Sequence, residues 1–325
     1  MPQNTIFILP ALLNNQQVFA TAGLPPNTEP EVKSEYVYTA TDSPAAFADM
    51  RNYGLRHGIN VPDYSLADKA AAPSKFTAAG FSLMVTTTVN IREDLSEFPF
   101  NRVILKPAIS VNGRAFGHPL ATALYTIKTK AELLNILDEL AAFSDPSLLA
   151  NNPIIAQQVA DGDGDNFEAL ILSGAVNGAG DIWHLAPIEL SQQYNDTGRN
   201  AKTVWSPENN TAETAQLQQC VERLLANVGS VNCFYQLQFL RSNGAWVPHD
   251  FQYRMTYYVD FGLEKLGFVQ HKVDVIKFAF DQSTQKPEQP RSFGLKLRAP
   301  KTSRDTKEFV EGANKAEVLA KLEAM

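Results

Sequence analysis

Hydrophobic and polar residues alternate along two neighbouring runs of the chain, FYQLQFLR at 234–241 and AWVPHDFQYR at 245–254. A period of two predicts β-strands, because successive side chains of a strand point to opposite faces. The second strand then carries Asp250, Gln252 and Arg254 on one face. A carboxylate, an amide oxygen and a guanidinium then point the same way.

The turn between these strands decides whether the amide of Gln238, on the first strand, faces the same way as Asp250. A three-residue loop with Gly244 in the left-handed conformation would pair Gln238 with Pro248 and place it beside Asp250, on the same face. A two-residue Asn-Gly turn would pair Gln238 with His249 and turn the amide away. We predict the three-residue loop, with Gln238 and Asp250 on one face.

The rest of the chain alternates between short strand patterns and helical patterns. Strands are predicted at residues 4–10, 35–40, 82–89, 102–109, 153–160, 168–176 and 181–190. Helices are predicted at residues 12–23, 43–57, 74–79, 130–143 and 212–229. The opening β/α order indicates a small open-sheet lobe, and the later order is that of an α+β protein.

This order divides the chain into four segments. They are an N-terminal α/β lobe at 1–64, a linker helix with a central lobe at 65–160, a C-terminal lobe at 161–285, and a tail at 286–325. The tail has nine Lys or Arg against six Asp or Glu, a net charge of +3, whereas the whole chain carries −7. We interpret the tail as a Pro-rich linker followed by a solvated helix; a partner-binding tail is the alternative.

Composition narrows the class of protein. The apolar fraction of 44% is typical of a globular protein, and no apolar run approaches the roughly 20 residues that cross a bilayer. The net charge of −7 argues against a surface devoted to nucleic-acid phosphates. Two cysteines, Cys220 and Cys233, are too few for a disulfide framework, and the N-terminus has no basic leader. We therefore expect a soluble protein of the cytoplasm. It could be a monomer or a homo-oligomer.

Taken in order, the motifs over residues 65–262 resemble those of the ATP-grasp superfamily, in particular the branch of biotin carboxylase and the carbamoyl phosphate synthetase large subunit. The resemblance implies an α/β and α+β fold of three lobes: a small N-terminal lobe, a central lid lobe, and a C-terminal antiparallel-sheet lobe. It also implies that ATP lies between the last two.

Three positions resemble the phosphate-binding parts of that family. Lys106, before Pro107 at the end of a strand, matches the lysine that contacts the α-phosphate and the adenine N7 region. Lys69 resembles the lysine at the start of the linker helix, and Lys75 could substitute for it. The loop with Gly113 and Gly117 resembles the mobile loop that covers the phosphates.

The strand at 153–160 and the segment after it resemble the adenine and ribose sites. Gln157, Gln158 and Val159 would contact adenine, and Gln157 stands where the family usually has Glu. Asn166, in the place of the usual acidic residue, or the nearby Glu168 would bind the ribose hydroxyls.

The strand pair at 234–254 resembles the magnesium-binding pair of the family. Asp250 would be the principal ligand in the usual Glu position, Gln252 replaces the usual Asn, and Gln238 would supply a third oxygen. Magnesium favours six oxygens, which phosphates and water would complete. Arg254 matches the final Arg of the family signature and would bind the γ-phosphate and the acyl phosphate.

The resemblance therefore predicts an enzyme, an ATP-grasp ligase that joins a carboxylate to an amine or a related nucleophile and releases ADP and phosphate. Its cofactors would be ATP and Mg²⁺. Its substrates would be a small or peptide-like carboxylate and an amine acceptor. The catalytic residues would be Lys69, Lys106 and Arg254. The alternative is a nucleotide-binding or scaffold protein that has lost catalysis.

Overall fold

The structure is a computed structural model of the whole chain. It describes residues 5–8, 16–39, 43–83, 86–89, 103–109, 124–125, 131, 135, 154–158, 167–195, 198–255, 263–286, 291–300 and 306–325. The predicted helix at 130–143 and the glycine loop with Gly113 and Gly117 fall largely or wholly outside these residues.

The N-terminal lobe has a small parallel sheet with the order β2-β1-β3. Its strands are β1 (Ile6–Ile8), β2 (Pro26–Asn27) and β3 (Tyr36–Tyr38), and its helices are α1 (Gln16–Thr21) and α2 (Pro44–His57). The sequence explains both ends of α2. The Ser43 side chain accepts a hydrogen bond from the Ala46 N–H at the start, and Gly58, with φ 65°, ends the helix in the left-handed conformation.

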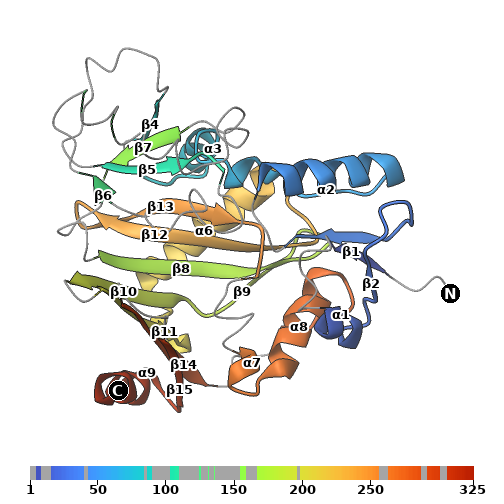
Figure 1. Cartoon of the computed structure of the whole chain (residues 1–325). Coiled ribbons are helices and arrows are strands. Elements are labelled where there is room, and N and C mark those ends of the chain that lie inside the picture. The colour runs from blue at the N-terminus through green and yellow to red at the C-terminus, as the bar shows by residue number, and fades with distance from the viewer. Residues whose placement is uncertain are drawn as a thin grey trace.

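A linker with the 3₁₀ helix η2 (Tyr64–Ala67) and helix α3 (Ala72–Ala78) leads to the second, four-stranded sheet. This sheet is antiparallel, with the order β4-β7-β5-β6. Its strands are β4 (Thr86–Val89), β5 (Val103–Pro107), β6 (Leu124–Tyr125) and β7 (Ile154–Gln158). In Figure 1 it lies above the β13 edge of the largest sheet.

The largest sheet is built from residues of the C-terminal half, in the order β13-β12-β8-β10-β11-β14-β15, with β9 paired to β8. Its strands are β8 (Phe167–Val176), β9 (Ile182–His184), β10 (Ile188–Asn195), β11 (Gly198–Trp205), β12 (Cys233–Ser242), β13 (Ala245–Gln252), β14 (Ser292–Pro300) and β15 (Thr306–Gly312). The accompanying helices are η3 (Pro207–Asn209), α6 (Ala212–Asn227), α7 (Leu263–Lys265), α8 (Val269–Ala279) and α9 (Lys315–Ala324).

Helices cover both faces of this sheet. Leu170 and Leu172 of β8 pack with Leu224 of α6 in one apolar cluster. Ile171 of the same strand packs with Ile276 of α8 in a second cluster. Because alternate residues of β8 enter different clusters, α6 and α8 lie on opposite faces, as Figure 1 also shows.

The C-terminal segment corrects the prediction of a linker and a solvated helix. β14 pairs with β11, and β15 pairs with β14, so residues 292–312 continue the sheet. Val318 and Leu322 of α9 are fully buried against this sheet, with Val204 of β11. The segment is therefore part of the fold of the C-terminal lobe.

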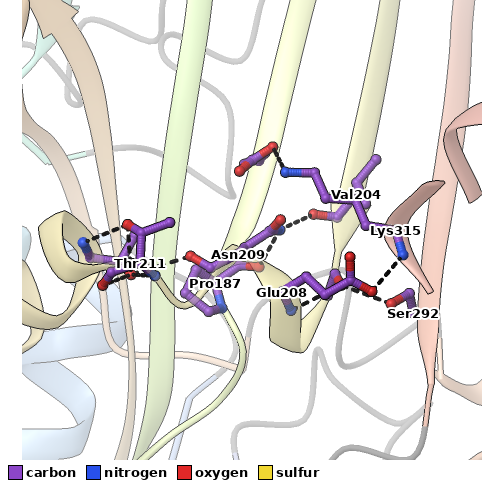
Figure 2. A network of polar contacts seen from close by, with 10 residues as sticks. Pro187, Val204, Glu208, Asn209, Thr211, Ser292 and Lys315 are labelled. Carbon is purple, nitrogen blue, oxygen red and sulfur yellow. Dashed lines mark hydrogen bonds and ion pairs between the residues drawn. The ribbon is translucent and has the colours of Figure 1, made fainter.

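A buried polar network joins η3 to the strands around it (Figure 2). The Asn209 side chain, 1% exposed, donates to the carbonyls of Pro187 and Val204 at 2.9 and 3.0 Å. Lys315 of α9 joins the same region, since its backbone N–H donates to the Glu208 carboxylate at 3.0 Å. The network fixes the chain between β11 and α6.

We expect Asn209→Ala to destabilise the fold by about 2–4 kcal/mol, because two buried carbonyls lose their donor and a cavity remains. Urea unfolding would measure the change. Asn210→Ala is the matched control, since Asn210 is the exposed neighbour in the same loop and should change stability by less than about 0.5 kcal/mol. Equal effects of the two substitutions would contradict the role of this network.

The elements expected in the first 80 residues are present in the described part of the chain, with α1 and α3 shorter or shifted at their ends. Among the described residues, no helix combines the length and the apolar character needed to cross a bilayer.

Candidate functional site at the edge of the large sheet

The hairpin between β12 and β13 differs from the predicted three-residue loop. Ser242 pairs with Ala245, so the turn contains only Asn243 and Gly244, with φ angles of 51° and 75°. Positive φ at both positions is the requirement of a type I′ turn, which Asn-Gly satisfies better than other sequences. The predicted loop was therefore wrong.

The register changes again further along the same hairpin. Phe239 pairs with Pro248, whereas Gln238 pairs with Asp250, so His249 is an extra residue in a β-bulge. Residues that are directly opposite in an antiparallel pair share a face, and Gln238 and Asp250 therefore lie on one face, as predicted. The bulge produces the common face that we had expected from a longer loop.

Four polar side chains share this face of the hairpin, because Gln236 pairs with Gln252 and Gln238 with Asp250. The Gln236 amide donates to Gln252 Oε1 at 3.1 Å, and the Gln252 amide donates to Asp250 Oδ2 at 3.0 Å. This chain of hydrogen bonds holds the Asp250 carboxylate in one orientation.

Lys69 reaches the same carboxylate from the linker. Its Nζ lies 2.8 Å from Asp250 Oδ1, and the two side chains are only 9% and 17% exposed. The backbone N–H of Lys69 donates to the Ala108 carbonyl at 2.8 Å. Ala108 directly follows β5, the strand that contains Lys106, so the linker, the small sheet and the β13 edge meet at this point.

The other lysine of the linker is placed differently. Lys75 Nζ forms an ion pair with Asp63 at 2.8 Å and a short hydrogen bond to Ser65. Its described contacts thus lie within the linker, and Lys69 is the one of the two lysines that contacts Asp250.

The remaining predicted residues are only partly brought together. Arg254 follows β13 by two residues and is half-buried. Glu168 is exposed on β8, where strand alternation places it on the α6 face, opposite to Asp250. Gln157 and Gln158 lie in β7, and Lys106 lies in β5. Gly113, Gly117, Val159 and Asn166 are outside the described residues.

Gln236 was not assigned to the site from the sequence. Its contact with Gln252 makes it part of the hydrogen-bonded chain. The bulge was also missed, although Pro248 signals it, because a proline cannot donate to a sheet ladder and occurs at edges and bulges. β13 is an edge strand of its sheet among the described residues.

The donor atoms suit a hard divalent cation only in part. The site offers one carboxylate, Asp250, and the amide oxygens of Gln238 and Gln252, which are the ligand types that Mg²⁺ prefers. Among the described residues, no three His, Cys, Asp or Glu side chains gather into a metal-binding group. The residues fit Mg²⁺ if phosphates and water complete its coordination.

Two histidines lie outside this site, His184, which is half-buried, and His271, which is buried. The His184 ring bonds to the Tyr235 hydroxyl and, through Nε2, to Glu222 at 2.9 Å, and His271 contacts the rings of Trp183 and Trp205. Burial lowers the pKa of both imidazoles below the usual value. Both therefore favour the neutral form in the folded protein.

Stability should consequently fall in mild acid. As the pH drops through about 6.5, the unfolded state takes up protons that these imidazoles resist, so the free energy of unfolding decreases by up to about 1.4 kcal/mol per pH unit for each group. Urea unfolding at about pH 7.5 and about pH 5.5 would show a smaller loss for His271→Phe, which keeps a ring between the tryptophans, than for the wild type. Equal losses would exclude His271 as a source of the effect.

Comparison with known proteins gives the fold. No family model matches the sequence, and no curated protein matches it. Solved structures match nearly the whole chain. The N5-carboxyaminoimidazole ribonucleotide synthetase of Thermus thermophilus is 12% identical, with a TM-score of 0.67, and the match covers 98% of this chain and 96% of that one.

Two other matched structures are of proteins that are named for different activities. The L-amino acid ligase of Bacillus licheniformis is 11% identical, with a TM-score of 0.61 and coverage of 99% and 96%. The biotin carboxylase domain of the Hydrogenobacter thermophilus 2-oxoglutarate carboxylase, in complex with MgADP, ADP and bicarbonate, is 10% identical, with a TM-score of 0.55 and coverage of 90% and 74%.

These similarities define the class of the protein at the level of its architecture. The chain has the ATP-grasp fold, with an N-terminal parallel α/β sheet and a C-terminal antiparallel-sheet lobe. The predicted fold class is confirmed.

Proposed function

We propose that this protein is an ATP-dependent ligase that joins a carboxylate to an amine or a related nucleophile and releases ADP and phosphate. The observation that supports it most is the contact of Lys69 with Asp250 at the β13 edge, beside the end of β5. A cation, a carboxylate and amide oxygens from different lobes meet there, where the sequence resemblance places the phosphates and their metal.

The chemistry would be that of phosphoryl transfer to a carboxylate. A bound Mg²⁺, held by Asp250, Gln238 and Gln252, would offset the charge of the phosphates. Lys69 and Lys106 would contact the nucleotide phosphates, and Arg254 would stabilise charge that develops on the γ-phosphate and the acyl phosphate. The hydrogen bonds from Gln236 to Gln252 and from Gln252 to Asp250 would keep the carboxylate oriented.

The small sheet of β4–β7 would act as the lid over the nucleotide, with the backbone of Gln157, Gln158 and Val159 at the adenine and Asn166 at the ribose. Glu168 lies on the opposite face of the large sheet from Asp250, so we do not retain it as a ribose ligand. Closure would exclude the water that hydrolyses an acyl phosphate.

A panel of compounds would identify the substrates. Solved structures of this fold include proteins named as an amino-acid ligase and as a carboxylase domain with bicarbonate, so amino acids and bicarbonate are suitable first carboxylates.

The second candidate function is that of a nucleotide-binding or scaffold protein, which would bind ATP without catalysing a reaction. One feature favours it: Lys69 neutralises Asp250, the carboxylate of the proposed metal site. The two proposals differ in their response to substrates.

The test is ADP release with MgATP, measured in a coupled assay, while amino acids, bicarbonate and simple amines are added alone and in pairs. A ligase should form ADP well above background only when a carboxylate and a suitable nucleophile are both present. ATP binding by calorimetry without any stimulated ADP release would favour the binding protein. Absence of nucleotide binding would exclude both.

A further inference from the structure

The Asp250 carboxylate has a counter-ion supplied by the protein. Lys69 Nζ is 2.8 Å from Oδ1, while the Gln252 amide donates to Oδ2 at 3.0 Å, so the ammonium forms an ion pair with one carboxylate oxygen and a hydrogen bond holds the other. Both charged side chains are largely buried, with 9% and 17% of their surfaces exposed. In such surroundings, water and salt screen the charges poorly, and the pairing is correspondingly strong.

This pairing changes what a divalent cation would meet at the carboxylate. Mg²⁺ coordinates oxygen at about 2.0–2.1 Å, closer than the ammonium of Lys69 now lies, and the two cations would repel each other across one carboxylate. The negative charge that should attract the metal is also already compensated. A metal ion without nucleotide therefore binds weakly to Asp250 while Lys69 stays in place.

A nucleotide triphosphate would relieve this conflict. Its oxygens carry several negative charges, which can accept the Lys69 ammonium and coordinate the metal as well. A lysine ammonium is a point charge on a flexible stem and can move between partners without the fixed geometry that a guanidinium needs. The Lys69 backbone, bonded to Ala108 at the end of β5, would remain where it is.

On the premise of the proposed function, we infer that Lys69 and the divalent cation compete for Asp250, so that metal binds there only when nucleotide phosphates draw Lys69 away. The lysine thus makes the metal site conditional on the nucleotide. It would be a residue that determines the order of binding, in addition to its role as a phosphate ligand.

The competition can be measured with Mn²⁺, a paramagnetic oxygen-seeking ion, titrated by electron paramagnetic resonance without any nucleotide. Lys69→Met should raise the Mn²⁺ affinity about 10-fold or more, in the usual range of coupling between two ligands. Methionine keeps the length and apolar character of the side chain. Adding Asp250→Asn to Lys69→Met should abolish the gain.

Lys75→Met is the matched control. It removes the same charge from the same linker, but from a lysine whose ion pair is with Asp63. Its Mn²⁺ affinity should equal that of the wild type. The competition is refuted if Lys69→Met binds Mn²⁺ no more tightly than the wild type, or if Lys75→Met gains as much.

A reciprocal experiment uses ATP in the presence of EDTA. Asp250→Asn releases Lys69 from its counter-ion, so this variant should bind metal-free ATP several-fold more tightly than the wild type, whereas Lys69→Met should bind it more weakly. Tighter or equal binding by the wild type would overturn the inference. Circular dichroism would check the fold of each variant, and Lys69→Gln would replace Lys69→Met if the latter is unfolded.

The outcomes separate this inference from the proposed function. Substrate-stimulated ADP release together with an unchanged Mn²⁺ affinity of Lys69→Met would retain the ligase and reject the competition. A gain in Mn²⁺ affinity without any ATP binding would retain the competition for Asp250 and reject the ligase.

Discussion

Asp250→Asn should reduce substrate-stimulated ADP formation by roughly 10²–10³-fold, the usual consequence of removing one preorganised electrostatic contact from a polar active site. Asp250 is the one carboxylate that the proposed metal site offers among the described residues. Asparagine has nearly the same shape but no charge, so the hydrogen bond with Gln252 can persist while the attraction for a divalent cation is lost.

The rate constant and the dependence on Mg²⁺ concentration should be measured together. If the metal role is correct, high Mg²⁺ should restore part of the rate. Asp274→Asn makes the same change on α8, where the carboxylate accepts from Gln270 at 2.7 Å, and it should leave the rate near that of the wild type. An unaltered rate in Asp250→Asn would remove this residue from the metal site.

Arg254→Ala should have an effect at least as large, about 10³-fold on kcat, because a guanidinium that stabilises charge on a transferred phosphoryl group acts mainly in the transition state. The KM for MgATP should change much less. Single-turnover measurement of phosphate release would locate the loss in the chemical step.

Two comparisons sharpen this prediction. Arg254→Lys should recover only a fraction of the activity, since an ammonium keeps the charge but lacks the planar fork of donors. Arg241→Ala, on the other strand of the hairpin, is the control. Its guanidinium lies 4.2 Å from the centre of the Trp246 ring, donates to the Gly244 carbonyl and pairs with Glu213 of α6 at 3.6 Å, so these contacts are with the turn region and the start of α6. Near-full phosphate release by Arg254→Ala would exclude the proposed role.

Local patterns predicted much of the fold. The alternation in 234–254 located β12 and β13, and the caps of α2 follow from Ser43 and Gly58. The strands β14 and β15 were missed even though Phe293, Leu295 and Leu297 alternate with other residues. The partner of β14 is β11, about ninety residues earlier in the chain, and the many charges of the segment obscured its apolar face.

The candidate site was predictable to the extent that it depends on one hairpin. The common face of Gln238 and Asp250 was correctly expected, although the turn and the bulge that produce it were not. The Lys69–Asp250 ion pair joins residues 181 positions apart. No local rule connects such positions, because only the packing of the linker against the β13 edge brings them together.

The bulge at His249 also constrains how the length of this hairpin can vary. Because His249 has no residue opposite it, the loss of one position between Gly244 and Asp250 would leave a regular ladder in which the carboxylate still lies opposite Gln238. The loss of a second position would turn the carboxylate to the reverse side of the strand. Inherited deletions of one residue should therefore be tolerated in this stretch, and deletions of two should be eliminated by selection.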